Sequence, residues 1–231
     1  MNSLPVLFIL ILIAALPVVL LFLWYNFARC PISTGWFLVF LTGGGASMFI
    51  ALLLQALIPS PSGLSPGGGF PGAMGPMVFN LFCRIAATEE TSRLLVFLLL
   101  FPLARIRGED AALRGSAAGL VAGLGFALVE NASYGASDAG IAVLRAVTSA
   151  PLHGACGERV GAALAGRKEG FFPALIRFLS AIAIHGTYNL MLRGSGIMAV
   201  MAILAALCAL ASSILSIRTQ IRNSEACLKT N

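Results

Sequence analysis

The stretch MVFNLFCRIAATEETSRLLVFLLLFPL, residues Met77 to Leu103, indicates the fold class of this chain. It is long enough to cross a bilayer, which takes about 20 predominantly apolar residues. Its middle nevertheless carries Glu89, Glu90 and Arg93. An ionisable group at the centre of a span costs about 2.5–3.5 kcal/mol even on lenient scales, so such groups normally face other helices or a polar interior. The stretch therefore predicts one span of a multi-helix bundle.

The rest of the chain is also strongly apolar, with few charged residues. Hydrophobic residues make up 58% of its 231 residues and charged residues only 10%, whereas a soluble domain has about 25% charged residues. About seven crossings fit this length, with no room left for a separate soluble domain. We expect one all-α polytopic transmembrane helix bundle over residues 1–231, with a motif-bearing core at about residues 77–192. The expected spans are approximately Leu4–Trp24, Gly35–Ile58, Met77–Leu103, Leu113–Tyr134, Ile141–Leu164, Phe171–Leu192 and Ile197–Ile217.

Two other segments give local predictions. Pro59 to Pro76 is rich in Pro, Gly and Ser and has no charge, which predicts a loop or re-entrant turn. Gly115, Gly119 and Gly123 follow one another at four-residue steps. Small residues at this spacing predict the close approach of another helix.

Basic residues orient the bundle. Although the net charge is +6, these residues are scattered, which argues against a nucleic-acid partner. They follow every second expected span. Arg29 follows the first span, and Arg105, Arg107 and Arg114 follow the third. Arg167 and Lys168 follow the fifth, and Arg218, Arg222 and Lys229 follow the seventh. The positive-inside rule then predicts a multi-pass cell-membrane protein, surrounded by lipid, with its N-terminus outside and its C-terminus cytoplasmic.

The remaining polar residues form stripes with a four-residue period, which places each stripe on one helix face. The stripes are Glu89–Arg93, Phe126–Glu130–Tyr134, Arg145–Ser149–His153 and Arg177–Ala181–His185–Asn189. Four polar stripes on adjacent spans are best accommodated in a shared interior, so we expect a functional site inside the bundle. Both histidines of the chain belong to these stripes.

We expect the arginines of these stripes to have structural and not catalytic roles. Arg93 lies four residues after Glu89, so we expect these two to pair and leave Glu90 freer. Arg145 and Arg177 are expected to extend toward the membrane interfaces.

Four short motifs resemble those of one protein family. Residues 89–93, EETSR, resemble the E-E-x-x-[K/R] motif of the PrsW intramembrane proteases, and residues 125–131, GFALVEN, resemble their G-F-x-x-x-E-N motif. Residues 149–154, SAPLHG, are similar to the S-x-P-x-H segment, and residues 184–189, IHGTYN, to the last motif. The wider group includes the CAAX prenyl proteases, which have histidine where Glu130 stands, so the resemblance favours PrsW.

The resemblance implies hydrolysis of a peptide bond in a single-span membrane protein, such as an anti-sigma factor. A carboxylate in a low-dielectric site suits a general base, so Glu89 or Glu90 is expected to activate water. Histidines bind a metal or stabilise an oxyanion. We expect Glu130, His153 and His185 to hold zinc, with Asn189 supporting the oxyanion. A metal-free mechanism, with a glutamate activating water directly, stays open.

Three alternatives remain at this point. Buried Glu and His side chains are equally typical of a proton- or ion-coupled transporter, although no inverted repeat is evident. A CAAX-type prenyl-protein protease and a non-catalytic scaffold that retains the motifs are the other two.

The predicted orientation has a direct test. A topology reporter fused after Asn231 should report the cytoplasm, and one inserted near Gly68 should report the outside. Two reporters on the same side would mean that the number of spans is wrong.

Overall fold

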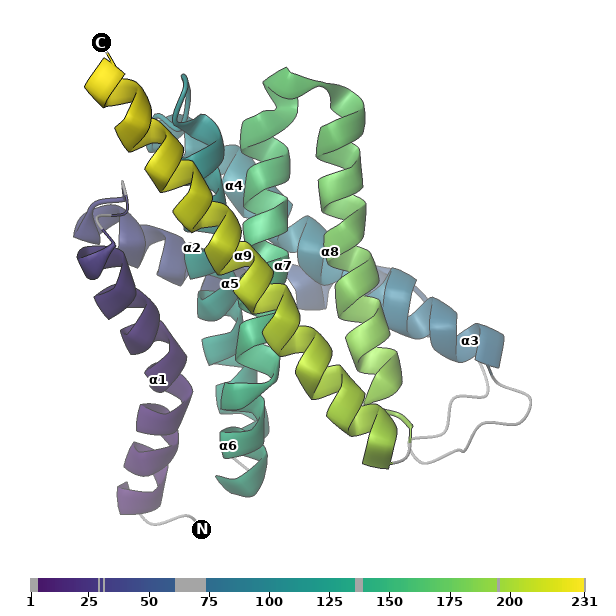
Figure 1. The fold of residues 1–231 in the computed structure, drawn as a ribbon. Coiled ribbons are helices and arrows are strands. Elements are labelled where there is room, and N and C mark those ends of the chain that lie inside the picture. The colour runs from purple at the N-terminus through teal and green to yellow at the C-terminus, as the bar shows by residue number, and fades with distance from the viewer. Residues whose placement is uncertain are drawn as a thin grey trace.

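Helices account for all regular secondary structure in the part of the chain that the computed structural model describes, namely residues 4–28, 30, 32–60, 74–135, 139–194 and 196–230. Within this part, the all-α bundle predicted from the sequence is confirmed (Figure 1). The elements are α1 (Leu4–Phe27), α2 (Thr34–Leu57), α3 (Met74–Phe79), the π-helix η1 (Asn80–Ala86), α4 (Ala87–Leu103), α5 (Ala111–Gly135), α6 (Ala139–Val147), α7 (Ser149–Ala165), the 3₁₀-helix η2 (Gly166–Glu169), α8 (Phe171–Met191) and α9 (Gly196–Thr230).

Four of these helices are long and apolar enough to cross a membrane: α2, α5, α8 and residues Gly196–Ser224 of α9. A helix satisfies its own backbone hydrogen bonds, which is why apolar stretches of this length adopt it in lipid. The other three expected spans fall on α1, on the continuous run α3–η1–α4, and on α6 with α7.

The third expected span differs from a plain helix. Its first half contains the π-helix η1, and π-helical turns are frequent at functional sites. The Phe82 ring of η1 packs where a side chain at Gly186 of α8 would stand, so η1 and α8 lie in close contact. The predicted loop from Pro59 to Pro76 was wrong at its end because α3 begins at Met74, and residues 61–73 lie outside the described part.

The fifth expected span is divided in two at Thr148, which separates α6 from α7. Pro151 explains the break, because its ring clashes with the carbonyl of the residue four positions earlier, Val147. The Thr148 hydroxyl donates to the Leu144 carbonyl oxygen at 2.8 Å, and Tyr188 of α8 donates to Thr148 Oγ1 at 3.1 Å. The break is therefore tied to α8 close to the predicted site.

The centre of the bundle is α5, whose apolar window is 78% buried. Its glycines lie directly against α7: a Cβ at Gly119 would overlap the carbonyl of Gly157, and one at Gly123 would overlap the carbonyl of His153. The opposite side of α5 meets α2, where Gly44 contacts the Ala122 backbone. The predicted role of the glycine stripe in close helix packing is confirmed.

Several arginines gather at one end of the bundle. Arg105, Arg107 and Arg167 line one cavity at the end where α4 and α7 finish, and Ser224 of α9 donates to Asp110 at this same end. In Figure 1, the start of α1 and the end of α9 lie at opposite ends of the bundle. Assigning the arginine-rich end to the cytoplasm remains a prediction.

The contact between α5 and α7 has a direct test in Gly123→Ala. The new methyl group would meet backbone atoms of His153 and Gly154, which cannot move out of its way as a side chain can. We expect a loss of about 3 kcal/mol of unfolding free energy, measured by thermal unfolding in detergent. The control is Gly35→Ala, where the methyl group meets nothing within 4 Å. Equal melting temperatures for the two variants would contradict the close packing.

Candidate active site

A cavity of about 410 Å³, called here the main cavity, collects the polar stripes predicted from the sequence. Five of the six predicted site residues line it: Glu89, Glu130, His153, His185 and Asn189. They come from α4, α5, α7 and α8, so the prediction that these helices share a polar interior is confirmed. Glu90, the sixth, is fully buried beside the cavity and does not line it.

Arg93 is a fully buried arginine that joins three helices. Its Nη1 donates to Glu90 Oε2 at 2.6 Å, its Nη2 lies 3.0 Å from His153 Nδ1, and its guanidinium stacks over the Phe126 ring at 4.5 Å. Arginine can only donate, so Nδ1 of His153 must accept. In a neutral imidazole the proton is then on Nε2, which donates to Glu130 Oε2 at 2.8 Å.

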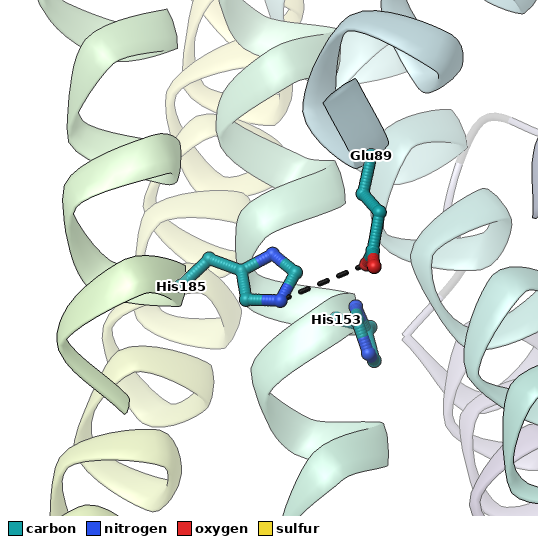
Figure 2. A group of neighbouring side chains, drawn as sticks. All are labelled: Glu89, His153 and His185. Carbon is teal, nitrogen blue, oxygen red and sulfur yellow. Dashed lines mark ion pairs between the residues drawn. The ribbon is translucent and has the colours of Figure 1, made fainter. Parts of the chain in front are cut away.

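Glu90 fixes the second histidine in the same way. Its Oε1 lies 2.8 Å from Nδ1 of His185 and accepts that proton, while Oε2 is occupied by Arg93. The lone pair of His185 is consequently on Nε2, which lies 3.7 Å from Glu89 Oε2 (Figure 2). A carboxylate that orients a histidine through its other nitrogen is a common supporting arrangement at metal sites.

Glu89 is the less constrained of the two adjacent glutamates. Its Oε2 is buried and makes no hydrogen bond within the described part of the chain, and its Oε1 receives only a long 3.4 Å bond from Gln55. The prediction that Arg93 would occupy Glu89 and free Glu90 was wrong, since Arg93 lies 3.8 Å from Glu89 but 2.6 Å from Glu90. The guanidinium turns toward α7 to reach His153, and Glu90 is on that side of α4.

Glu130 is held by its own arginine. Arg145 pairs with Glu130 Oε2, and its Nε donates to Asn131 at 2.9 Å. Its Nη2 also donates to Ser149 at 3.1 Å, and its guanidinium covers the Tyr134 ring at 4.1 Å. Arg145 was expected to reach a membrane interface, and this was wrong, because the carboxylate of Glu130 offers a much closer counter-charge. The four-residue spacing of Arg145, Ser149 and His153 was the signal for this inward orientation.

The donor atoms of the site fit a metal ion. Among the described residues, Glu89, His153 and His185 offer ligand atoms that all lie within 4.8 Å of one another. Two histidines and a carboxylate form a common set of zinc ligands that leaves one coordination position open. The Glu89 oxygen that has no hydrogen bond within the described part of the chain is available as the carboxylate ligand. His153 would give up its bond to Glu130 on binding. The sequence named Glu130 in place of Glu89, but Glu130 is not part of this group.

One group of charged residues was missed by the sequence interpretation. Glu158 and Arg159 follow His153 by about one and a half turns on α7 and lie among α5, α8 and α9. Two adjacent ionisable residues inside an apolar span were the available signal.

Comparison with protein-family profiles identifies the family of this sequence. A family profile described as PrsW family intramembrane metalloprotease matches residues 32–214. The chain belongs to the PrsW family. The resemblance drawn from the four motifs is confirmed, and all four lie within the matched residues. Comparison with curated proteins and with solved structures gave no match.

Membership of the PrsW family supports an intramembrane protease over a transporter. The polar cluster of Glu89, Glu90, Arg93, Glu130, His153 and His185 lies within that matched segment. The active-site interpretation of the main cavity therefore has support from both the family and the geometry.

The unequal roles of the adjacent glutamates predict unequal stabilities. Glu90→Gln offers one acceptor where Arg93 and His185 need two, and it leaves a buried guanidinium without its closest counter-charge. We expect a loss of about 3–5 kcal/mol in unfolding free energy. Glu89→Gln should cost less than about 1 kcal/mol, because hydrogen bonds to this side chain are few and weak. Thermal unfolding in detergent measures both, and a larger loss for Glu89→Gln would contradict the assignment.

Proposed function

We propose that this chain is an intramembrane endopeptidase that hydrolyses a peptide bond of a membrane-anchored protein in the main cavity, with Glu89 as the general base. The observation that carries the proposal is the buried Glu89 oxygen, which faces the cavity beside His153 and His185 and has no hydrogen bond to any residue that the structure describes. A base must keep an oxygen available for the proton of water. Glu90 has both of its oxygens engaged.

Each residue of the site then has a role in the reaction. Glu89 accepts a proton from water as the water oxygen attacks the carbonyl carbon of the substrate. The developing oxyanion is stabilised by Asn189, which lines the cavity one turn beyond His185. Glu89 returns the proton to the departing amine as the carbon–nitrogen bond breaks. Arg93 and Glu90 hold the two imidazole rings in place throughout.

The same residues would hold a metal. Glu89, His153 and His185 are the ligand set that the geometry favours, and zinc is the ion that such a set suits. A Glu89 oxygen that held the metal could not also accept the proton of water, so the general-base role of Glu89 applies to the metal-free site and its ligand role to the metal-bound one. Zinc bound there would supply Lewis acidity that polarises the scissile carbonyl. The surrounding charges are compatible with it, since the polar cluster and Arg145 together contain three carboxylates and two guanidinium groups.

The cavity walls fit an unfolded segment of a single-span protein. Met48 and Leu52 of α2 and Leu81 and Ile85 of η1 provide apolar surface around the polar centre. A regulator of the anti-sigma-factor kind, with one span, is a substrate of this class. The cavity lies toward the end opposite the arginine-rich loops, so with a cytoplasmic C-terminus cleavage takes place in the outer half of the membrane.

Mapping of new peptide termini tests the activity. Membranes of cells that express the wild-type chain should contain cleaved single-span proteins that are absent with Glu89→Gln, because loss of a general base slows hydrolysis by about 10²–10⁴-fold. Glu109→Gln is the control, since Glu109 is exposed between α4 and α5. Identical termini with wild type and Glu89→Gln would refute the proposed role.

Metal analysis of purified protein tests the ligand set. We expect about one zinc ion per chain, lost in His153→Ala and His185→Ala, together with inhibition of cleavage by 1,10-phenanthroline that added zinc reverses. Glu89→Gln should lose zinc, whereas Glu130→Gln should retain it, because Glu130 lies outside the ligand group. Cleavage at the full rate by metal-free protein would exclude the metal and leave Glu89 to activate water alone.

A further inference from the structure

A second cavity of about 410 Å³ lies at the arginine-rich end of the bundle, between the end of α4, the loop that leads to α5 and the end of α7. We call it the α4–α7 cavity. It shares no lining residue with the main cavity. Along the helices its lining is apolar, with Phe97, Leu98 and Phe101 from α4 and Leu164 from α7. The α4–α7 cavity is therefore apolar on its helical side and charged where the loop and the end of α7 line it.

The charged part of the α4–α7 cavity carries an excess of positive charge. It consists of Arg105, Arg107, Arg167 and Glu109, all of which are exposed. None of these four side chains has an ion pair or a hydrogen bond within the described part of the chain. Three guanidinium groups and one carboxylate therefore face the same space without close counter-charges, and such a space attracts an anion.

The backbone of Arg105 has a conformation that glycine usually provides. α4 ends in a Schellman motif, in which the N–H of Ile106 donates to the Phe101 carbonyl oxygen at 3.0 Å. In the same motif, the N–H of Arg105 donates to the Pro102 carbonyl oxygen at 3.1 Å. Arg105 follows the C-cap residue Ala104 and has a φ of 51°, in the left-handed region. Because glycine is the favoured residue at this position, an arginine there indicates a role for its side chain.

The loop that carries these arginines is held in place by α5. Nη1 of Arg114 donates to the carbonyl oxygen of Arg105 at 3.2 Å, and its Nη2 donates to that of Ala104 at 2.9 Å. The backbone at Arg105 is thus fixed from both sides, by the end of α4 and by Arg114. A backbone that is already fixed loses little freedom when its side chains bind a ligand, which favours affinity.

We propose that the α4–α7 cavity binds an anionic phospholipid, with the headgroup phosphate at Arg105, Arg107 and Arg167. The planar guanidinium matches the geometry of phosphate oxygens. Leu98 is exposed on α4 about two turns before Arg105, so the apolar side of the cavity can take the start of an acyl chain. This apolar side favours a lipid over a soluble anion. Basic pockets between membrane helices are a known kind of lipid site. The site is independent of the proposed peptide hydrolysis.

Lipid binding to the purified full-length protein tests the proposal. Native mass spectrometry with phosphatidylglycerol and phosphatidylcholine of the same acyl chains should show tighter binding of phosphatidylglycerol. Arg107→Gln/Arg167→Gln should weaken phosphatidylglycerol binding by about tenfold or more, since hydrogen bonds to charged groups are lost. Arg218→Gln/Arg222→Gln is the control of equal charge, because it removes two exposed arginines of α9 that do not line the cavity. Equal binding by the two double variants would overturn the proposal.

Arg105 allows a test in which stability and binding change in opposite directions. Arg105→Gly should raise the melting temperature in lipid-free detergent by about 2–4 °C, because glycine accepts the left-handed conformation without strain. The same variant should weaken phosphatidylglycerol binding. Arg105→Ala is the matched control, since it removes the guanidinium but keeps the strain, and it should lose binding without the rise in melting temperature. Full phosphatidylglycerol binding by Arg105→Gly would contradict the role given to this side chain.

Inorganic phosphate separates the lipid from a soluble anion. Phosphatidylglycerol should raise the melting temperature of the wild-type protein, whereas inorganic phosphate should leave it unchanged, because only the lipid also covers the apolar side of the cavity. Equal stabilisation by inorganic phosphate would overturn the assignment to a lipid.

Discussion

The guanidinium of Arg93 is a full charge with no exposure to solvent, inside a bundle that is itself surrounded by lipid. Such a charge is tolerated only with a close counter-charge and with its hydrogen bonds directed at acceptors. Glu90, His153 and the face of Phe126 meet these requirements from α4, α7 and α5. The helices must therefore lie within a side-chain length of one another. The glycines along the contact between α5 and α7 allow that spacing.

This constraint separates two chemically identical neighbours. Consecutive residues of an α-helix point about 100° apart, so Glu89 and Glu90 cannot face the same surroundings. Glu90 is turned to the interior, where Arg93 and His185 use both of its oxygens. Glu89 is left at the wall of the main cavity, near the Nε2 atom that Glu90 orients on His185. The buried ion pair of Glu90 with Arg93 and the carboxylate of Glu89, proposed here as the general base, thus lie on one turn of α4.

Much of this arrangement is predictable from the sequence, because a bilayer leaves few options for polar residues. The apolar runs predict the helices, and the polar stripes of four-residue period that contain Glu130, His153 and His185 predict that these residues face a common interior. Which glutamate Arg93 selects is not predictable in this way, since Glu89 and Glu90 are both within its reach along α4. The choice depends on His153, a residue 60 positions away. The inward orientation of Arg145 was indicated by its four-residue spacing from Ser149 and His153, but its pairing with Glu130 depends on a residue of another helix.

The central claim is that the planar guanidinium of Arg93 sets the geometry of the site by contacting Glu90 and His153 at once. The most direct measurement is the cleavage rate of reconstituted Arg93→Lys with a substrate of the wild-type protein. Lysine keeps the charge but lacks the fork that reaches both partners. The account predicts a rate lower by about a hundredfold, because small misplacements of catalytic groups have effects of that size. Cleavage by Arg93→Lys at the wild-type rate would contradict it.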